Sequence, residues 1–106
     1  MSLEITYSIE RNTFSEDVFD GNEDIFVNFT NGDRYVATFF TYKNIESLRQ
    51  KNQKTGEELS GKYFWASDMI LINDLRTETI KNVIDDLIKD YSFKSVFSEI
   101  KKEDFD

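Results

Sequence analysis

The stretch Asp24-Ile-Phe-Val-Asn-Phe-Thr-Asn-Gly-Asp-Arg-Tyr-Val-Ala-Thr-Phe-Phe-Thr41 decides the predicted fold. Two runs rich in β-branched and aromatic residues flank the dipeptide Asn31-Gly32. Asn and Gly tolerate the positive φ angles of tight hairpin turns, so the pattern is a strong signal for two antiparallel strands. We therefore expect the fold to be built around a β-hairpin.

The register of this hairpin is argued from burial, because a one-residue slip moves every side chain to the opposite face. A two-residue loop would place Arg34 and Thr38 on the face of Ile25. A three-residue loop of residues 31–33 collects the apolar side chains better, and we favour it. The predicted core face then consists of Ile25, Val27, Phe29, Tyr35, Ala37 and Phe39.

The segments around the hairpin alternate in type. Residues 3–9 show strand alternation and are followed by a polar loop over 10–23. After the hairpin, Thr41 or Asn44 is placed to cap a helix that ends near Asn52. A loop over residues 53–62 then leads into a strand that ends at Ile72.

The C-terminal third is predicted to be helical. From a cap at Thr77, apolar residues follow helical spacing, and Phe93 to Ile100 repeat that spacing in a second, shorter helix. The stripe of the first helix consists of Ile80, Val83, Ile84, Leu87, Ile88 and Tyr91.

The predicted order is therefore β-β-β-α-β-α-α, which is typical of a single α+β domain over residues 1–106. We expect a mostly antiparallel sheet of about four strands with two to three helices packed on one face. The helix near 44–52 also allows the last strand to run parallel to its predecessor.

Charge restricts the classes of partner. The formal net charge is −8, spread over both halves of the chain. Such a surface repels phosphate backbones and anionic membranes, so we expect neither a nucleic-acid nor a membrane partner. It suits a basic protein partner or simple solubility. The chain has no apolar run near 18 residues and no signal-peptide pattern, so we expect cytoplasmic localisation.

Composition also restricts the chemistry. The chain has no His and no Cys, which excludes a Ser-His-Asp triad, a Cys nucleophile and a zinc site of imidazoles and thiolates. Residues 20–24 begin like a calcium loop, but Ile25 and Asn31 stand where the motif needs Gly and an acid. We predict no cofactor, no metal and no enzymatic activity. A minimal carboxylate-based hydrolase stays open as an alternative.

The segment Lys62-Tyr-Phe-Trp-Ala-Ser-Asp-Met-Ile-Leu-Ile72 holds the candidate binding residues. On an unbroken strand Asp68 would share a face with apolar residues, where an unpaired carboxylate costs several kcal/mol. We therefore predict a bulge or turn at Ser67-Asp68, and a functional Asp68 pointing into a pocket is the alternative. The candidate binding set is Tyr63, Trp65, Asp68, Glu57 and Glu58.

Residues 37–42, 54–57 and 63–70 resemble a group of small uncharacterised bacterial proteins. This resemblance implies no known activity. In size, in acidity and in lacking His and Cys, the chain also looks like immunity proteins that neutralise bacterial toxins.

These features predict a small acidic protein-interaction module, immunity-like in type, that masks a basic partner. The alternative is a small-molecule-binding domain with an aromatic pocket near Trp65. Homo-oligomerisation also stays open, because apolar residues on the second sheet face, such as Phe26 and Val36, would need cover.

Overall fold

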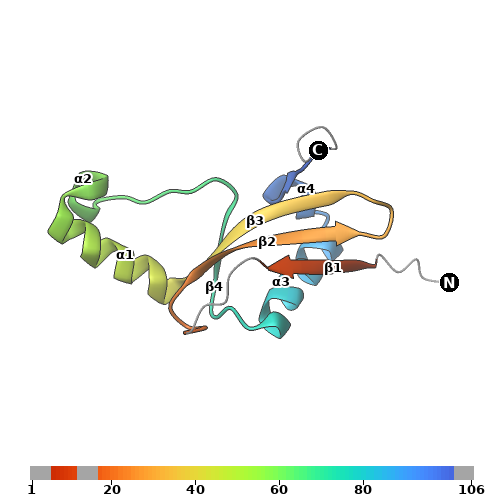
Figure 1. The fold of residues 1–106 in the computed structure, drawn as a ribbon, viewed down its shortest axis with the longest axis horizontal. Helices are drawn as coiled ribbons and strands as arrows, with labels where there is room; N and C mark the ends of the chain where they lie inside the picture. Colours follow the sequence, from red (N-terminus) through yellow and green to blue (C-terminus); the bar gives the residue numbers. More distant parts are fainter. Residues whose placement is uncertain (1–5, 12–16, 102–106) are drawn as a thin grey trace.

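A computed structural model describes residues 6–11 and 17–101, which fold in the order β1-β2-β3-α1-α2-β4-α3-α4-β5 (Figure 1). The strands are β1 (Tyr7–Arg11), β2 (Asn22–Phe29), β3 (Arg34–Thr41), β4 (Met69–Ile72) and β5 (Ser98–Glu99). The helices are α1 (Tyr42–Thr55), α2 (Glu57–Gly61), α3 (Thr77–Lys89) and α4 (Phe93–Val96). The predicted α+β class is confirmed, with α2 and β5 as short additions.

The sheet is mostly antiparallel, as predicted. Its order is β1-β2-β3-β4, and the pairs β1–β2 and β2–β3 are antiparallel. The helical connection between β3 and β4 makes that pair parallel, which a hairpin turn could not do. β5 lies on the same side of β3 as β4, pairing with Tyr35 and Val36 while β4 pairs with residues 38–41.

The hairpin has the predicted faces but a different register. Val27 pairs with Tyr35 and Ile25 with Ala37, so the core face is as expected. The loop, however, is 30–32 rather than 31–33, because Phe29 N donates to the Asp33 carbonyl (2.9 Å). Gly32 has φ 97°, the left-handed conformation that the third residue of a three-residue hairpin loop adopts. The loop therefore ends at its glycine, which shifts the predicted pairing by two residues.

Helices α3 and α4 cover one face of the sheet (Figure 1), and the core lies between them and that face. Ile80 and Ile84 of α3 are fully buried, as their spacing predicts. Phe93 stacks on Phe97 with 4.3 Å between ring centroids. The other buried core residues are Ile25, Val27, Tyr35, Ala37, Phe39, Ile72 and Leu75.

The C-terminal prediction needs two corrections. Tyr91 lies outside α3 and is 95% exposed, because the helix ends in a turn in which Ser92 N donates to Leu87 O and Tyr91 N to Ile88 O. The last helix stops at Val96, so Phe97 is not helical. Ile100 N donates to the Arg34 carbonyl (2.8 Å), which continues the β5 pairing with β3 in place of the predicted helix.

Helix α1 begins where the sequence predicts. The Thr41 hydroxyl accepts a hydrogen bond from Asn44 N (3.1 Å), so Thr41 is the N-cap, but the helix extends beyond Asn52 to Thr55. α1 contributes no residue to the core cluster, and with α2 it projects from the end of the sheet (Figure 1). The molecule is accordingly elongated, with extents of 54 × 30 × 25 Å. We call residues 42–61 the arm.

The N-terminal strand extends further along the chain than predicted. β1 continues to Arg11, which the prediction placed in a loop, and β2 starts at Asn22 rather than Asp24. Leu3 and Ile5 of the predicted strand lie outside the described residues. None of the helices in the described part of the chain combines the length and apolarity needed to cross a membrane.

Candidate functional site

The predicted binding residues lie along the path that leads from the arm back to the sheet. Glu57 and Glu58 belong to α2, Tyr63 and Trp65 follow it, and Asp68 immediately precedes β4. They do not converge on one point. Glu57 is held locally, by the Thr55 hydroxyl at 2.9 Å and by Lys51 at 3.7 Å.

Residues 63–67, here called the aromatic segment, alternate between inward and outward side chains. Phe64 packs against Phe40, with ring centroids 5.3 Å apart in a T-shaped contact. Tyr63 and Trp65 point outward and are 50% and 67% exposed. Within the described part of the chain, the backbone groups of Tyr63, Phe64 and Trp65 form no hydrogen bond with another backbone group, and the segment ends in the turn at Ser67-Asp68. The segment is therefore presented like a free strand edge, which can pair with an added strand.

The predicted turn at Ser67-Asp68 is confirmed. Asp68 adopts φ 55°, a left-handed conformation that Asp tolerates better than most residues. Its carbonyl accepts from Thr38 N (2.9 Å), and its carboxylate accepts from the Ser98 hydroxyl (2.7 Å). The carboxylate thus binds β5 instead of capping neighbouring backbone amides. Sequence reasoning could not find this contact, because β5 itself was not predicted.

A left-handed turn connects α1 to the aromatic segment. Glu58, Leu59 and Ser60 have φ of 53°, 51° and 57°, between two glycines that also have positive φ. Left-handed geometry costs roughly 1–2 kcal/mol for each residue with a side chain. The prediction of a plain loop over 53–62 was therefore wrong. The turn leaves Leu59 69% exposed at the tip of the arm.

Charge is distributed unevenly between the arm with its aromatic segment and the rest of the molecule. Residues 42–66 hold five Lys or Arg and three Glu. The remaining residues hold eight basic and eighteen acidic side chains, so the chain's excess of negative charge lies outside the arm. Tyr63 and Trp65 therefore extend from the locally basic part of the chain and not from its acidic part.

A buried ion pair joins three parts of the fold, and sequence reasoning missed it. Glu23 is 2% exposed, and its carboxylate accepts hydrogen bonds from both Nε and Nη2 of Arg11. Arg11 Nη2 also donates to the Leu75 carbonyl (2.9 Å) and Nη1 to the Thr77 hydroxyl (3.1 Å). The hydrogen-bonded Glu23 raises the pKa of Arg11. The sequence contains a signal for the burial of Glu23, because this residue continues the alternation of Ile25 and Val27 on the core face.

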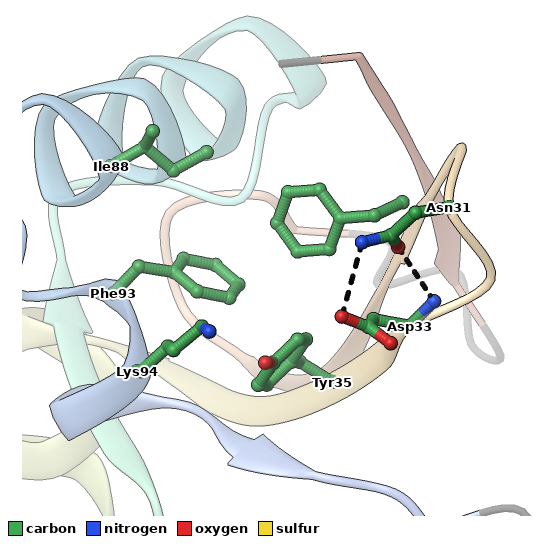
Figure 2. A pocket seen from close by; sticks show the side chains of 7 residues that line it. Asn31, Asp33, Tyr35, Ile88, Phe93 and Lys94 are labelled. Carbon is green, nitrogen blue, oxygen red and sulfur yellow. Dashed lines mark hydrogen bonds between the residues drawn. The ribbon is translucent and has the colours of Figure 1, made fainter.

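A pocket of about 270 Å³ opens at the turn end of the β2–β3 hairpin, facing α3 and α4 (Figure 2). Its lining includes Phe29 and Tyr35 from the hairpin, Ile88 from α3, and Phe93 and Lys94 from α4. The remaining lining residues are Asn31 and Asp33. Neither Tyr63 nor Trp65 lines it, so it is not the pocket expected beside Trp65.

The described residues bring no three acids together in a geometry that could hold a metal ion. Asp20, the first residue of the segment that begins like a calcium loop, accepts hydrogen bonds from Asn44 Nδ2 and Ser47 Oγ, both at 3.0 Å. These bonds lower the pKa of Asp20. The carboxylate thus ties this loop to α1.

Comparison of the chain with protein-family models, with curated proteins and with solved structures finds no match.

Proposed function

We propose that this chain is a protein-binding module whose main anchor is the aromatic segment. The observation that supports this most is the exposure of Tyr63 and Trp65 on a stretch, residues 63–65, whose backbone groups have no backbone hydrogen-bond partner in the described part of the chain. Aromatic side chains contribute large contact area at low entropy cost and dominate binding hot spots. The unpaired backbone adds hydrogen-bonding capacity for an extended segment of the partner.

The electrostatics favour an immunity-like form of this function, in which the module masks a basic partner. Eighteen acids against eight bases lie outside residues 42–66, so the body of the molecule would attract a positively charged surface. In this arrangement the acidic body meets the basic surface while Trp65 anchors a neighbouring apolar patch. Association should then be fast at low salt and slower as salt screens the body.

The test uses immobilised full-length chain and lysate of the native host at about 50 mM and about 500 mM salt. We expect a basic protein that is retained by the wild-type chain and lost from a Tyr63→Ser/Trp65→Ser variant. The matched control is Phe19→Ser/Tyr91→Ser, which removes two aromatic residues that are 52% and 95% exposed elsewhere. Equal retention by the Tyr63/Trp65 variant, or no specific retention at low salt, would refute the proposal.

A further inference from the structure

The floor of the hairpin-end pocket is a rigid aromatic cluster. The ring centroids of Phe29, Tyr35 and Phe93 lie 5.1–5.7 Å apart, and each pair meets edge to face at 78–90°. Tyr35 and Phe93 are only 4% and 5% exposed, so packing fixes their orientation. The pocket therefore offers a preformed apolar surface for a flat ring, which reduces the ordering cost of binding.

Two opposite charges flank this floor on different sides. Figure 2 shows the Lys94 ammonium and the Tyr35 hydroxyl on one side of the pocket and Asp33 on the other. Among the described residues Lys94 forms no ion pair. The Lys94 ammonium is thus the positive group of the pocket lining.

Asp33 is held in place by the turn itself. Its backbone N donates to Asn31 Oδ1 (2.9 Å), and its carboxylate accepts from Asn31 Nδ2 (3.2 Å), as the dashed lines of Figure 2 show. One negative acceptor is thereby presented at a fixed position opposite Lys94.

The volume of the pocket and the net charge of the chain restrict the class of ligand that could bind. A volume of about 270 Å³ equals roughly nine water molecules at about 30 Å³ each, which suits a molecule with one ring and not a nucleotide. The net charge of −8 disfavours a simple anion. A zwitterion avoids that repulsion and matches a site that carries one positive and one negative group.

We propose that this pocket binds a small aromatic amino acid in its zwitterionic form. The ring lies on Phe29, Tyr35 and Phe93, the carboxylate faces Lys94 and the Tyr35 hydroxyl, and the ammonium faces Asp33. This binding is independent of the aromatic segment, because neither Tyr63 nor Trp65 lines the pocket.

The experiment is an amide NMR titration of the full chain with L-phenylalanine. Three analogues each lack one group: phenylpropionate lacks the ammonium, phenethylamine the carboxylate and alanine the ring. We expect saturable shifts of residues 29–35 and 93–94, with a Kd on the order of 1 mM for so small a ligand. Each analogue should bind at least about tenfold more weakly, because one of the three contacts is missing.

Variants test the two charged groups. Lys94→Met and Asp33→Asn should each weaken phenylalanine binding about tenfold or more. Lys89→Met should leave it unchanged, because Lys89 does not line this pocket. The proposal is overturned if phenylalanine causes no saturable shifts at these residues up to about 10 mM. It is equally overturned if phenylpropionate binds as tightly as phenylalanine, or if Lys94→Met binds like the wild type.

Discussion

Tyr91 combines a strained backbone with almost complete exposure. It has φ 60° at the end of α3, and its side chain is 95% exposed. Glycine is the usual residue at this position of a helix-terminating turn, because it has no Cβ to clash with the backbone. From the sequence alone, Tyr91 is predicted to lie on the apolar stripe, because its spacing from Leu87 and Ile88 is helical. Spacing does not reveal where the helix stops.

Replacing Tyr91 with Gly should stabilise the protein. Relief of the left-handed strain outweighs the greater unfolded-state freedom of Gly, so we expect the free energy of unfolding to rise by roughly 0.5–1 kcal/mol. Urea unfolding measures this change. The control Lys81→Gly, an exposed position inside α3, should lower the same free energy by roughly 0.7–1 kcal/mol. A loss of stability in Tyr91→Gly would show that the strain argument is wrong.

At Asp68 the turn could be predicted from the sequence, but the partner of the side chain could not. The cost of burying an unpaired carboxylate predicts the turn at Ser67-Asp68, and the structure contains that turn. The partner of the carboxylate, Ser98, could not be predicted, because it lies thirty residues away on a two-residue strand. A segment that short has no alternation from which to recognise it.

Among the elements, the left-handed turn α2 depends on its glycines in two different ways. Gly56 and Gly61 both have positive φ (87° and 79°). A Cβ on Gly56 would meet nothing within 4 Å, whereas a Cβ on Gly61 would lie 2.6 Å from the Arg49 carbonyl oxygen. The two positions therefore separate backbone strain from a steric clash with α1.

Gly56→Ala should lower the free energy of unfolding by roughly 1–2 kcal/mol through strain alone. Gly61→Ala should lower the same free energy by roughly 1–3 kcal/mol more than Gly56→Ala does, because α1 must also move away from the new Cβ. Amide hydrogen exchange across the arm is the suitable readout, since the arm contributes nothing to the core and can open locally. Equal protection of the arm in both variants would contradict the packing of Gly61 against Arg49.

The Arg11–Glu23 pair joins β1 and β2 to the connection between β4 and α3. Arg11→Met leaves the buried Glu23 carboxylate without its partner and should lower the free energy of unfolding by roughly 3–5 kcal/mol. The double variant Arg11→Met/Glu23→Leu should lose less than this single variant, because no charge is left buried. Urea unfolding of the wild type, of both these variants and of Glu23→Leu gives a double-mutant cycle for the free energy of unfolding. Additive losses would show that the two side chains are not coupled.

The sequence predicts elements better than their lengths and pairings. Repeated apolar spacing predicts α3, the dipeptide Asn31-Gly32 between two strand-like runs predicts the hairpin, and Thr41 or Asn44 is the predicted cap of α1, of which the structure has Thr41. The hairpin pairing is shifted by two residues because the prediction did not place Gly32 last in its loop, where the left-handed conformation is required. The strand that ends at Ile72 is β4 (Met69–Ile72), as the predicted turn at Ser67-Asp68 implies, and residues 63–66 before that turn pair with no strand.

At the scale of the whole molecule, an acidic body carries a basic, aromatic arm. Counting charge by halves of the sequence hides this separation, since each half is equally negative. A count of charged residues over 42–66 alone shows an excess of basic side chains there. Only the structure shows that these residues project from the sheet together (Figure 1). The separation gives the two parts different roles in the proposed binding: the body steers a basic partner, and the aromatic segment anchors it.

The role of the aromatic segment is tested most directly by the affinity of the captured partner for single-site variants, measured by calorimetry at fixed salt. Trp65→Ala should leave the thermal stability of the chain unchanged, because the side chain is 67% exposed. It should weaken binding about 30-fold or more, the effect of losing a hot-spot residue worth about 2 kcal/mol. Tyr91→Ala, the exposed control, should bind within about twofold of the wild type. A change of less than about threefold for Trp65→Ala would contradict the claim that the aromatic segment is the binding site.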